Sequence, residues 1–314
     1  MAISEKSYII MASFMCNIQK HSRFIMRHFF LPLSIVFAFA FNSFGQASNG
    51  RMNSLLAAEN YFAAFAKEKG IREAFLKVSD SETLLFRPNP VKAEEFFDKK
   101  SEDQGGLIWE PVYARLSRSG DWGFTTGPYT HTASENAVPT FGQYLSVWQA
   151  NKKGVWKLAL DLGISHPEPQ LKPELNFKDP RNFKFFRQLS PARLKQREDM
   201  IMTTDQLFSN TLRKNQDLAY EVFTANEARL LFPGYEPIIG KANISTFRTE
   251  HELSIITEPV QANRALGSDL AYTYGKAHIT KNNVSSAYNY VRIWESQEGY
   301  KWNMILEIFS PAKI

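Results

Sequence analysis

The first candidates for acid–base chemistry are the four histidines beyond residue 45, namely His131, His166, His251 and His278. His131 falls late in a predicted strand, and on the inner face of a sheet it could act as a general base with help from Asp161. Tyr61, on a predicted helix, is the third candidate for the same site. A histidine at a strand end more often lies in solvent, and no partner is fixed by spacing. The residue types therefore allow proton transfer but do not require it.

Other catalytic and metal-binding patterns are incomplete. The acids of a sequence repeat look like catalytic pairs: Glu110 with Asp121, and Glu258 with Asp269. The two aspartates follow Gly or Ser in predicted turns, where Asp has an ordinary structural role. His251 and Glu252 begin a His-Glu-x-x-His metal motif, but Ile255 stands where the second histidine belongs. The sequence holds neither a Gly-rich phosphate loop nor a Gly-x-Ser-x-Gly elbow. We expect no metal and no cofactor.

Aromatic side chains are the other candidates for a functional site, since they make up 14% of the chain. Small-ligand pockets are lined by aromatic side chains with a few polar tips. The residues expected to line such a pocket are Tyr61, Phe65, Trp109, Trp122, Tyr129 and Tyr144. A role in the core alone is equally compatible with their types. Two pairs, Trp148 with Trp156 and Trp294 with Trp302, are predicted to be cross-strand packing partners.

Residues 1–45 read as a secretory signal peptide, in which basic residues precede an apolar run at 29–41 and small residues end at Gly45. We expect cleavage after Gly45 and a secreted or periplasmic protein without stable membrane insertion. The run of 13 residues is short of the roughly 20 that span a bilayer, which disfavours the alternatives of a membrane anchor or an interior helix. Met26 would begin a compact signal peptide by itself, so residues 1–25 could be a mis-assigned start.

Charge and cysteine content exclude several classes of function. Removal of residues 1–45 takes away four Lys/Arg and one Glu, which leaves a net charge of +2. This charge gives no electrostatic footprint for nucleic acid. The single cysteine, Cys16, is also removed, so we expect neither disulfides nor a thiol nucleophile in the mature chain. A basic and aromatic stretch at 183–187 is a weak signal for nucleic acid or membrane, and packing on a neighbouring domain explains it better.

Hydrophobic periodicity and turn residues predict helices followed by long strands, twice over. The first set comprises helices at 53–69, 71–77 and 91–100 and strands at 83–86, 107–117, 121–132, 142–151 and 154–163. The second comprises helices at 191–215 and 240–249, with a short helix between them, and strands at 228–232, 252–263, 269–280, 285–296 and 300–309. Ser54 and Ser190 are predicted N-caps, and Gly70 is a predicted helix end. Prolines between the sets, at 166–190, predict an extended linker.

The two sets are copies of one pattern. The first reads Ile108-Trp-Glu-Pro-Val112, Ser119-Gly-Asp121, Gly127, Tyr144, Trp148, Gly154 and Trp156. The second reads Ile256-Thr-Glu-Pro-Val260, Gly267-Ser-Asp269, Gly275, Tyr290, Trp294, Gly299 and Trp302. The offset is 148 residues at the Glu-Pro-Val segment and 146 at the tryptophans, which indicates a loop two residues shorter in the second copy.

Over residues 52–163 and 197–311 this pattern resembles the nuclear-transport-factor-2-like superfamily, which includes SnoaL-like polyketide cyclases and ketosteroid isomerases. The resemblance implies an α+β fold of two tandem cone-shaped domains, each with three helices packed on a curved, mostly antiparallel sheet around an apolar pocket. It also implies an intramolecular pseudo-dimer of the two domains. Such a fold hosts enzymes, binders and dimerisation modules, so it does not settle function.

The catalytic residues of ketosteroid isomerases do not carry over. These enzymes use a helix tyrosine, a protonated acid in the sheet and an aspartate base after the first strand. The three positions fall near Tyr61, Tyr144 and Arg87 in the first copy, and near Leu207, Tyr290 and Phe232 in the second. Neither copy has a carboxylate at the base position. The resemblance therefore implies that steroid-isomerase chemistry is absent.

These inferences predict a signal peptide at 1–45, a first domain at 50–165, a linker at 166–190 and a second domain at 191–314. The favoured function is non-catalytic binding of a small apolar molecule, or an interaction role. One alternative is an enzyme of cyclase, isomerase or dehydratase type with its active pocket in the first domain. The other is a protein-interaction scaffold whose cones are filled by their own side chains.

Overall fold

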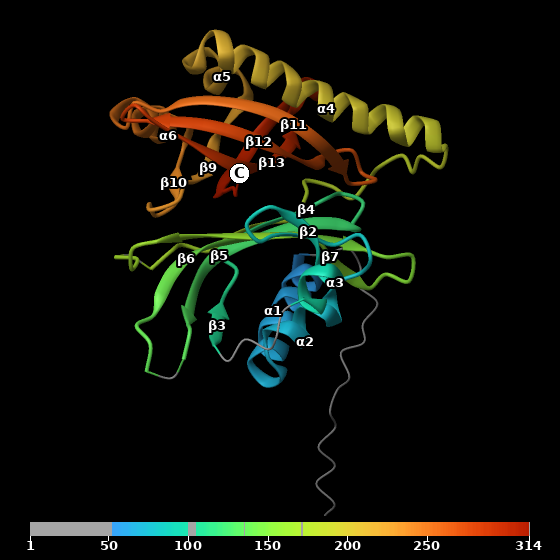
Figure 1. Ribbon diagram of the computed structural model, residues 1–314. Helices are drawn as coiled ribbons and strands as arrows, with labels where there is room; N and C mark the ends of the chain where they lie inside the picture. The colour runs from blue at the N-terminus through green and yellow to red at the C-terminus, as the bar shows by residue number, and fades with distance from the viewer. Residues whose placement is uncertain (1–51, 100–104, 135, 171, 314) are drawn as a thin grey trace, which may run out of the picture. The chain divides into compact units, whose positions relative to one another are not determined.

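The computed structural model describes residues 52–99, 105–134, 136–170 and 172–313. The predicted signal peptide and its cleavage after Gly45 lie outside the described residues. The fold is α+β, with two separate sheets and the helices on their outer sides (Figure 1). Among the residues described, no helix is long and apolar enough to cross a membrane.

The first half, residues 52–166, contains three helices and seven strands. They are α1 (Met52–Lys69), α2 (Ile71–Val78), α3 (Ala93–Asp98), β1 (Leu84–Phe86), β2 (Pro90–Lys92), β3 (Gly106–Trp109), β4 (Tyr113–Leu116), β5 (Trp122–Thr132), β6 (Thr140–Ala150) and β7 (Trp156–His166). The connector, residues 167–190, contributes β8 (Asn176–Lys178). The predicted order of helices and strands is therefore confirmed in this half.

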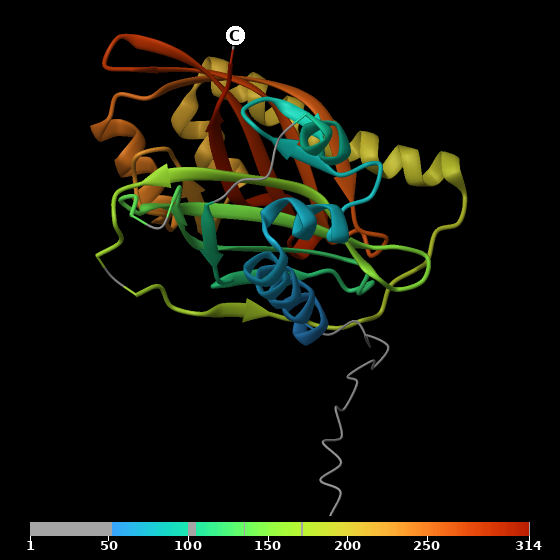
Figure 2. The same ribbon diagram turned by 60° about the horizontal axis from the view of Figure 1, so that its bottom comes forward.

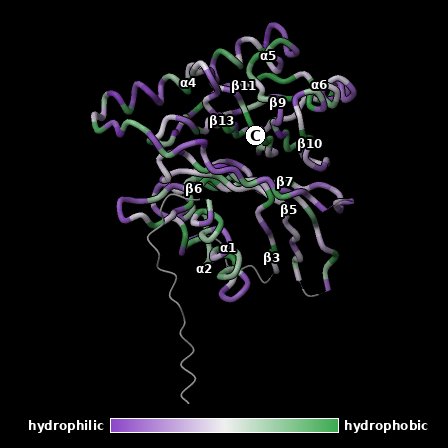
Figure 3. Tube along the Cα trace, turned by 180° about the vertical axis from the view of Figure 1, so that it is seen from behind, coloured by the Kyte–Doolittle hydropathy of each residue, from purple (hydrophilic) through white to green (hydrophobic). Residues whose placement is uncertain are grey.

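The second half, residues 191–313, repeats this order. Its elements are α4 (Pro191–Lys214), α5 (Gln216–Phe223), β9 (Thr224–Leu231), β10 (Ile238–Ile239), α6 (Lys241–Glu250), β11 (Ser254–Arg264), β12 (Leu270–Lys281), β13 (Val284–Ser296), the 3₁₀ turn η1 (Glu298–Tyr300) and β14 (Trp302–Pro311). The first turns of α4 are mostly hydrophilic (Figure 3). Ser190 precedes α4, but its side chain makes no capping hydrogen bond.

Both sheets share one strand order. The first runs β2-β1-β7-β6-β5-β4-β8, with β3 beside β5, and the second runs β10-β9-β14-β13-β12-β11. In each, the short strand after the second helix pairs in parallel with the last long strand, and the long strands are antiparallel. The predicted repeat is therefore also a repeat of topology.

Local chemistry explains where the elements begin and end. Gly70 ends α1 with a φ of +90°, a conformation that glycine adopts without strain. Ser54 is not the N-cap, because α1 already includes Met52. The predicted helix at 91–100 begins later, at Ala93, because Pro90–Lys92 pairs with β1 as β2.

The predicted strand at 107–117 is divided by the Glu-Pro-Val segment of the repeat. Proline has no N–H to donate to a strand ladder, and β3 ends at Trp109 while β4 begins at Tyr113; in the second copy the same segment stays within β11, with a register shift after Pro259. The backbone here lies against Gly127, where an added Cβ would lie 1.9 Å from the carbonyl oxygen of Glu110. Gly275 and Glu258 repeat this close approach at 2.2 Å. The repeated glycines thus serve the packing of this bend.

The tryptophans of each predicted cross-strand pair do not lie directly opposite each other, although each pair belongs to one apolar cluster. Trp148 lies opposite Leu158 and Trp156 opposite Ala150, and Trp294 lies opposite Met304 and Trp302 opposite Ser296, so each pair is offset by two residues. A register shift also occurs directly before Trp148 and before Trp294.

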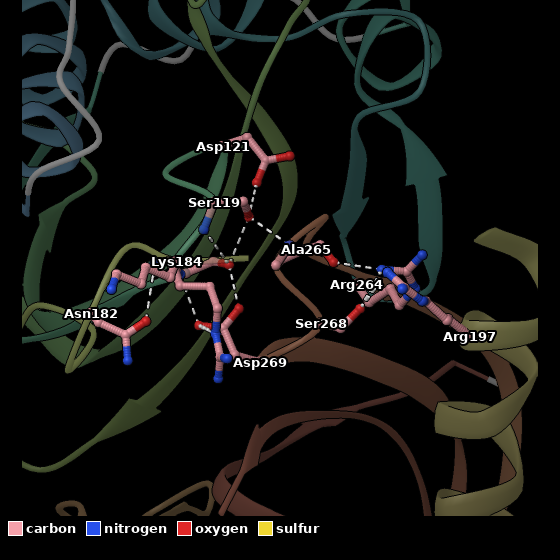
Figure 4. A network of polar contacts seen from close by, with 12 residues as sticks. Ser119, Asp121, Asn182, Lys184, Arg197, Arg264, Ala265, Ser268 and Asp269 are labelled. Atoms are coloured by element: carbon pink, nitrogen blue, oxygen red, sulfur yellow. Dashed lines mark hydrogen bonds and ion pairs between the residues drawn. The ribbon is translucent and has the colours of Figure 1, made fainter. Parts of the chain in front are cut away.

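The sheet faces that point away from the helices share one apolar cluster. Its members include Trp122, Leu145 and Leu160 from the first sheet, and Tyr272, Val291 and Ile308 from the second. The Trp122 and Tyr272 rings stack with their centres 6.3 Å apart. The turns of the repeat also meet: Asp269 accepts hydrogen bonds from the Ser117 hydroxyl at 2.5 Å and the Arg118 amide at 2.8 Å. Figure 4 shows Asp269 close to Ser119 and Asp121 of the first half.

The connector at 167–190 is more ordered than a free linker. Its strand β8 pairs in parallel with β4 and extends the edge of the first sheet (Figure 2). Asp179 accepts a hydrogen bond from the backbone amide of Met52, which ties the connector to the start of α1.

Candidate functional site

The first half holds a half-open cavity of about 700 Å³ between its helices and the concave face of its sheet, which Ser310 and Pro311 of the second half also line. Aromatic side chains supply most of its apolar wall: Phe62, Phe75, Phe96, Phe97, Trp109 and Tyr144. The volume lies within the roughly 300–1,000 Å³ of small-molecule pockets. The cavity is therefore large enough for a small organic ligand.

A polar group of three side chains forms part of this wall. Asp161, on β7, is buried and accepts a hydrogen bond from the Ser146 hydroxyl on the neighbouring strand β6 at 2.9 Å. Its other oxygen pairs with the Arg87 guanidinium at 2.5 Å. Arg87 directly follows β1, the strand parallel to β7, and this neighbourhood brings the two charges together. The pair offers a fixed polar point inside an apolar cavity.

A second carboxyl group, that of Glu59, lies deeper in the first half. It is buried on α1 and accepts hydrogen bonds from the indole N–H groups of Trp109 at 2.6 Å and Trp148 at 2.8 Å, and from the Thr125 hydroxyl. Burial raises its pKa from about 4.5 to about 7, against the lowering effect of these hydrogen bonds. None of the three donors is a cation.

The Tyr144 hydroxyl is a poorly paired polar group of the cavity. The residue is 6% exposed and lines the cavity, and among the described residues its hydroxyl has only the Thr125 side chain beside it, without a hydrogen bond of ordinary geometry. The neighbouring Thr125 donates its proton to Glu59 instead. Burial raises the pKa of the Tyr144 hydroxyl well above its ordinary value, with the nearby charge of Glu59 as a further cause, so the group stays protonated.

Five of the residues singled out in the sequence line this cavity: His131, Asp161, Trp109, Tyr129 and Tyr144. Three others do not. Tyr61 is 48% exposed on the outer side of α1, and its ring lies beside that of Phe65. Trp122 is buried between the two sheets. The expectation that Tyr61, Phe65 and Trp122 form the pocket wall is therefore wrong, because helix and strand faces turn them elsewhere.

His131 and Asp161 share the cavity but not a reaction centre. Asp161 lies in register with Ser146, which in turn lies opposite Thr125 on β5. His131 is six residues farther along β5, roughly 20 Å at about 3.3 Å per residue. Direct assistance of His131 by Asp161 would require hydrogen-bond distance. The predicted acid–base pair is not assembled.

In the second half, the space that corresponds to this cavity is occupied by the protein itself. Arg292, fully buried on β13, pairs with Glu307 at 2.7 Å and with Asp205. The Tyr290 hydroxyl donates to Asp205 at 2.9 Å, and the Tyr220 hydroxyl to Glu307 at 2.6 Å. Such a network keeps two buried carboxylates next to one cation.

The register explains why one half is hollow and the other filled. Tyr144 pairs with Gly163 and Ser146 with Asp161, whereas Tyr290 pairs with Phe309 and Arg292 with Glu307. Three positions therefore differ in size or chemistry between the halves: Ser146 against Arg292, Gly163 against Phe309, and Arg87 against Phe232. Phe232 and Phe309 pack with their ring centres 6.0 Å apart.

Sequence reasoning missed Glu59, Ser146 and Arg292. Glu59 sits among apolar residues of an amphipathic helix, and a charge on the buried face was the available signal. Asp205 occupies the same place 146 residues later, so the repeat carried a second signal. Ser146 and Gly163 differ from their counterparts Arg292 and Phe309, and this difference between the copies was the available signal for them.

A larger cavity, of about 840 Å³, is polar and is lined by residues of both halves and the connector. Its wall carries six basic side chains, Arg115, Arg118, Lys178, Arg181, Lys241 and Lys301, and six acidic ones, Asp179, Glu221, Glu227, Asp269, Glu295 and Glu298. The numbers of basic and acidic side chains are equal, so the wall of this cavity does not favour a ligand of either charge. Within the described ranges, no group of three or more His, Cys, Asp or Glu residues is placed to hold a metal ion.

Comparisons with known proteins found similarity only among solved structures. No family model matches the chain, and no curated protein matches it. An NTF2-like protein from Cytophaga hutchinsonii is 13% identical, over 36% of this chain and 97% of that one, with a TM-score of 0.32. A ketosteroid isomerase-like protein from Erwinia carotovora atroseptica is 13% identical, over 36% and 95%, with a TM-score of 0.32.

A third solved structure, an NTF2-like protein with a cystatin-like fold from Novosphingobium aromaticivorans, is 10% identical, over 39% of this chain and 86% of that one, with a TM-score of 0.31. These are the kinds of protein that the sequence resemblance named. Each alignment spans well under half of this chain.

Proposed function

We propose that this protein binds a small, largely apolar molecule in the first-half cavity and carries out no chemistry on it. The cavity of about 700 Å³ and its aromatic wall support this proposal most strongly. The polar group of Ser146, Asp161 and Arg87 would orient the ligand. The filled second half would serve as a scaffold.

The arrangement of charges favours binding over catalysis. The carboxylate of Asp161 is held by Arg87 and Ser146, so each of its oxygens already has a partner within the protein. His131 lies far along β5 from Asp161. A pocket without converging titratable groups is the arrangement expected of a binder.

Titration with a neutral fluorescent probe, Nile red, tests the proposal. We expect saturable binding to the wild-type protein and at least a tenfold weaker affinity for Gly163→Leu, whose side chain would fill the cavity. Gly106→Leu is the matched control, because a Cβ there meets nothing within 4 Å and Gly106 does not line the cavity. Equal binding by the wild type and Gly163→Leu, or no saturable binding by the wild type, would contradict the proposal.

An enzyme is the second candidate, and one observation favours it. The pKa of Glu59, raised by burial to about 7, is where a general acid or base works best near neutral pH. Its oxygens, however, already accept three hydrogen bonds. Conversion of a bound molecule by the wild-type protein and not by Glu59→Gln would favour the enzyme, whereas recovery of the unchanged ligand would favour the binder.

We further propose that binding takes place outside the cytoplasm, because residues 1–45 read as a signal peptide. Mass spectrometry of the protein made by its native host tests this. The expected mature chain begins at Gln46, and a chain that retains residues 26–45 would contradict the proposal.

A further inference from the structure

The second half holds a cation at a position where the first half has a serine. The Arg292 guanidinium lies 4.4 Å from the ring centre of Phe208 and 3.9 Å from that of Tyr290. It also pairs with the carboxylates of Asp205 and Glu307. Two aromatic faces and two acids are the surroundings in which a buried guanidinium or ammonium group is stable.

The first half retains all four of these surroundings. At an offset of 146 residues, Phe62 and Tyr144 correspond to the two rings, and Glu59 and Asp161 to the two acids. Phe62, Tyr144 and Asp161 line the cavity. Ser146 stands in the place of Arg292, on the same strand and opposite the corresponding acid. The first half therefore keeps the two rings and the two acids but has no cation at the position that corresponds to the Arg292 guanidinium.

The Tyr144 hydroxyl is independent evidence for a ligand. In the second half the corresponding Tyr290 hydroxyl donates to Asp205 at 2.9 Å. The Tyr144 side chain is also buried, but its hydroxyl has no carboxylate partner among the described residues; the Thr125 hydroxyl lies beside it and donates to Glu59. A buried polar group of this kind requires a hydrogen-bonding partner, and a ligand in the cavity could supply it.

The charges around the cavity leave one acid without a cation. Arg87 is paired with Asp161, and Arg72, which also lines the cavity, is paired with Glu73 at 3.1 Å. Neither arginine therefore carries an unbalanced positive charge toward the ligand. Glu59 is the remaining acid; it does not line the cavity but lies behind Trp109, which does, and its three hydrogen-bond donors are all neutral.

We propose that the ligand of the first-half cavity has a cationic head, an amine or guanidinium group, which takes the place of the Arg292 guanidinium beside Ser146 and Tyr144. The apolar body of the ligand then lies against the aromatic wall. This inference rests on the proposed binding function and narrows it to a chemical class. The carboxylate of Glu59 balances the charge of the cationic head, and Tyr144 contacts the head through its ring and its hydroxyl.

Three probes that differ only in the head group test the inference: 4-phenylbutylamine, 4-phenylbutanol and 4-phenylbutyrate. Isothermal titration calorimetry with the full chain at pH 7.5 measures their affinities. We expect the amine to bind at least tenfold more tightly than the alcohol, and the carboxylate to bind more weakly than either. This comparison uses the wild-type protein, so it does not depend on the folding of a variant.

Two variants separate a built cation site from general attraction of amines. Ser146→Arg should copy the second half and weaken amine binding at least tenfold, whereas Ser285→Arg adds the same charge at an exposed strand position. Glu59→Gln should narrow the ratio of amine to alcohol affinity. Circular dichroism and the midpoint of thermal unfolding show whether each variant is folded.

The outcomes distinguish this inference from the function on which it rests. Binding of the alcohol or the carboxylate as tight as that of the amine would overturn the cationic head and leave small-ligand binding standing. An unchanged amine-to-alcohol ratio in folded Glu59→Gln would also overturn it. Failure of all three probes and of Nile red to bind would overturn the proposed function itself.

Discussion

The two halves of this protein use one strand order in two ways. The first surrounds a cavity of about 700 Å³, whereas the second fills the corresponding space with Arg292, Phe232 and Phe309. Both halves keep an acid on the long helix, an acid on the last strand and a tyrosine between them. The difference is made by a few positions that face inward, while the close approach of a glycine to the Glu-Pro-Val segment is kept in both halves.

This difference shows how a duplicated fold divides its roles. The residues that match between the copies build the sheet, as the close approach of Gly127 to Glu110 and of Gly275 to Glu258 shows. The residues that differ decide whether the space between helices and sheet holds protein atoms or a ligand. Function in such a chain is more readily found by comparing the copies where they disagree.

The largest expected effect comes from removing the cation of the second half. Arg292→Ser would leave the carboxylates of Asp205 and Glu307 buried without a counter-charge, which costs about 3–5 kcal/mol of unfolding free energy. Urea denaturation measures this. The control is Arg181→Ser, which breaks an exposed ion pair with Glu298 and should stay within about 0.5 kcal/mol. Equal effects of the two changes would contradict the role assigned to Arg292.

The second prediction concerns pH and the unpaired acid of the first half. Because burial raises the folded-state pKa of Glu59 to about 7, the unfolded chain releases a proton between about pH 4.5 and 7 that the folded chain retains. Stability should therefore fall by about 3 kcal/mol as pH rises through this window. Urea denaturation at several pH values should show this slope in the wild type and its loss in Glu59→Gln. Identical slopes would show that Glu59 is not the group responsible.

The third prediction compares the turn aspartates of the repeat. Asp269 accepts hydrogen bonds from Ser117 and Arg118 of the first half, and Asp121 accepts hydrogen bonds from Ser119 of its own turn (Figure 4) and from the backbone of Leu266 in the second half. Asp269 is buried, whereas Asp121 is only half-buried. Asp269→Ala should cost about 1–3 kcal/mol, because it leaves buried donors unsatisfied. Asp121→Ala should cost less by the same measurement of chemical denaturation, because water can reach the donors that it leaves. A larger loss for Asp121→Ala would mean that burial of the aspartate does not set the strength of the contact between the turns.

The smallest expected effect concerns Tyr61 and Leu207, the corresponding positions on the long helices of the two halves. Tyr61 and Leu207 are 48% and 54% exposed, so neither faces the space beneath its helix. Tyr61→Ala and Leu207→Ala should each change the unfolding free energy by less than about 0.5 kcal/mol and leave Nile red affinity unchanged. A loss of affinity in Tyr61→Ala would place the ligand outside the cavity described above.

The fold was largely predictable, because periodicity, turn residues and the internal repeat all point to the same elements. The division of the strand at 107–117 and the shifts before Trp148 and Trp294 were not, since bends and bulges depend on contacts between strands. Of the residues singled out in the sequence, His131, Asp161 and Tyr144 line the first-half cavity. The partner of Asp161 is Arg87, whose position had been noted only for lacking a carboxylate.

Glu59 could not be assigned a role from the sequence, because its environment is made by Trp109, Thr125 and Trp148, which lie 50 to 89 residues away. The openness of the first half could not be predicted either. It depends on the small size of Ser146 and Gly163, where the second half has Arg292 and Phe309. Only the register of β6 and β7 shows that these two positions face the same space.

The central claim is that the first half is hollow where the second is filled. Xenon binds in apolar cavities, so a crystal structure under xenon pressure tests the claim directly. The account predicts xenon beside Phe62 and Tyr144 in the first half and none at Phe208 and Tyr290 in the second. Xenon at both places, or only in the second half, would contradict it.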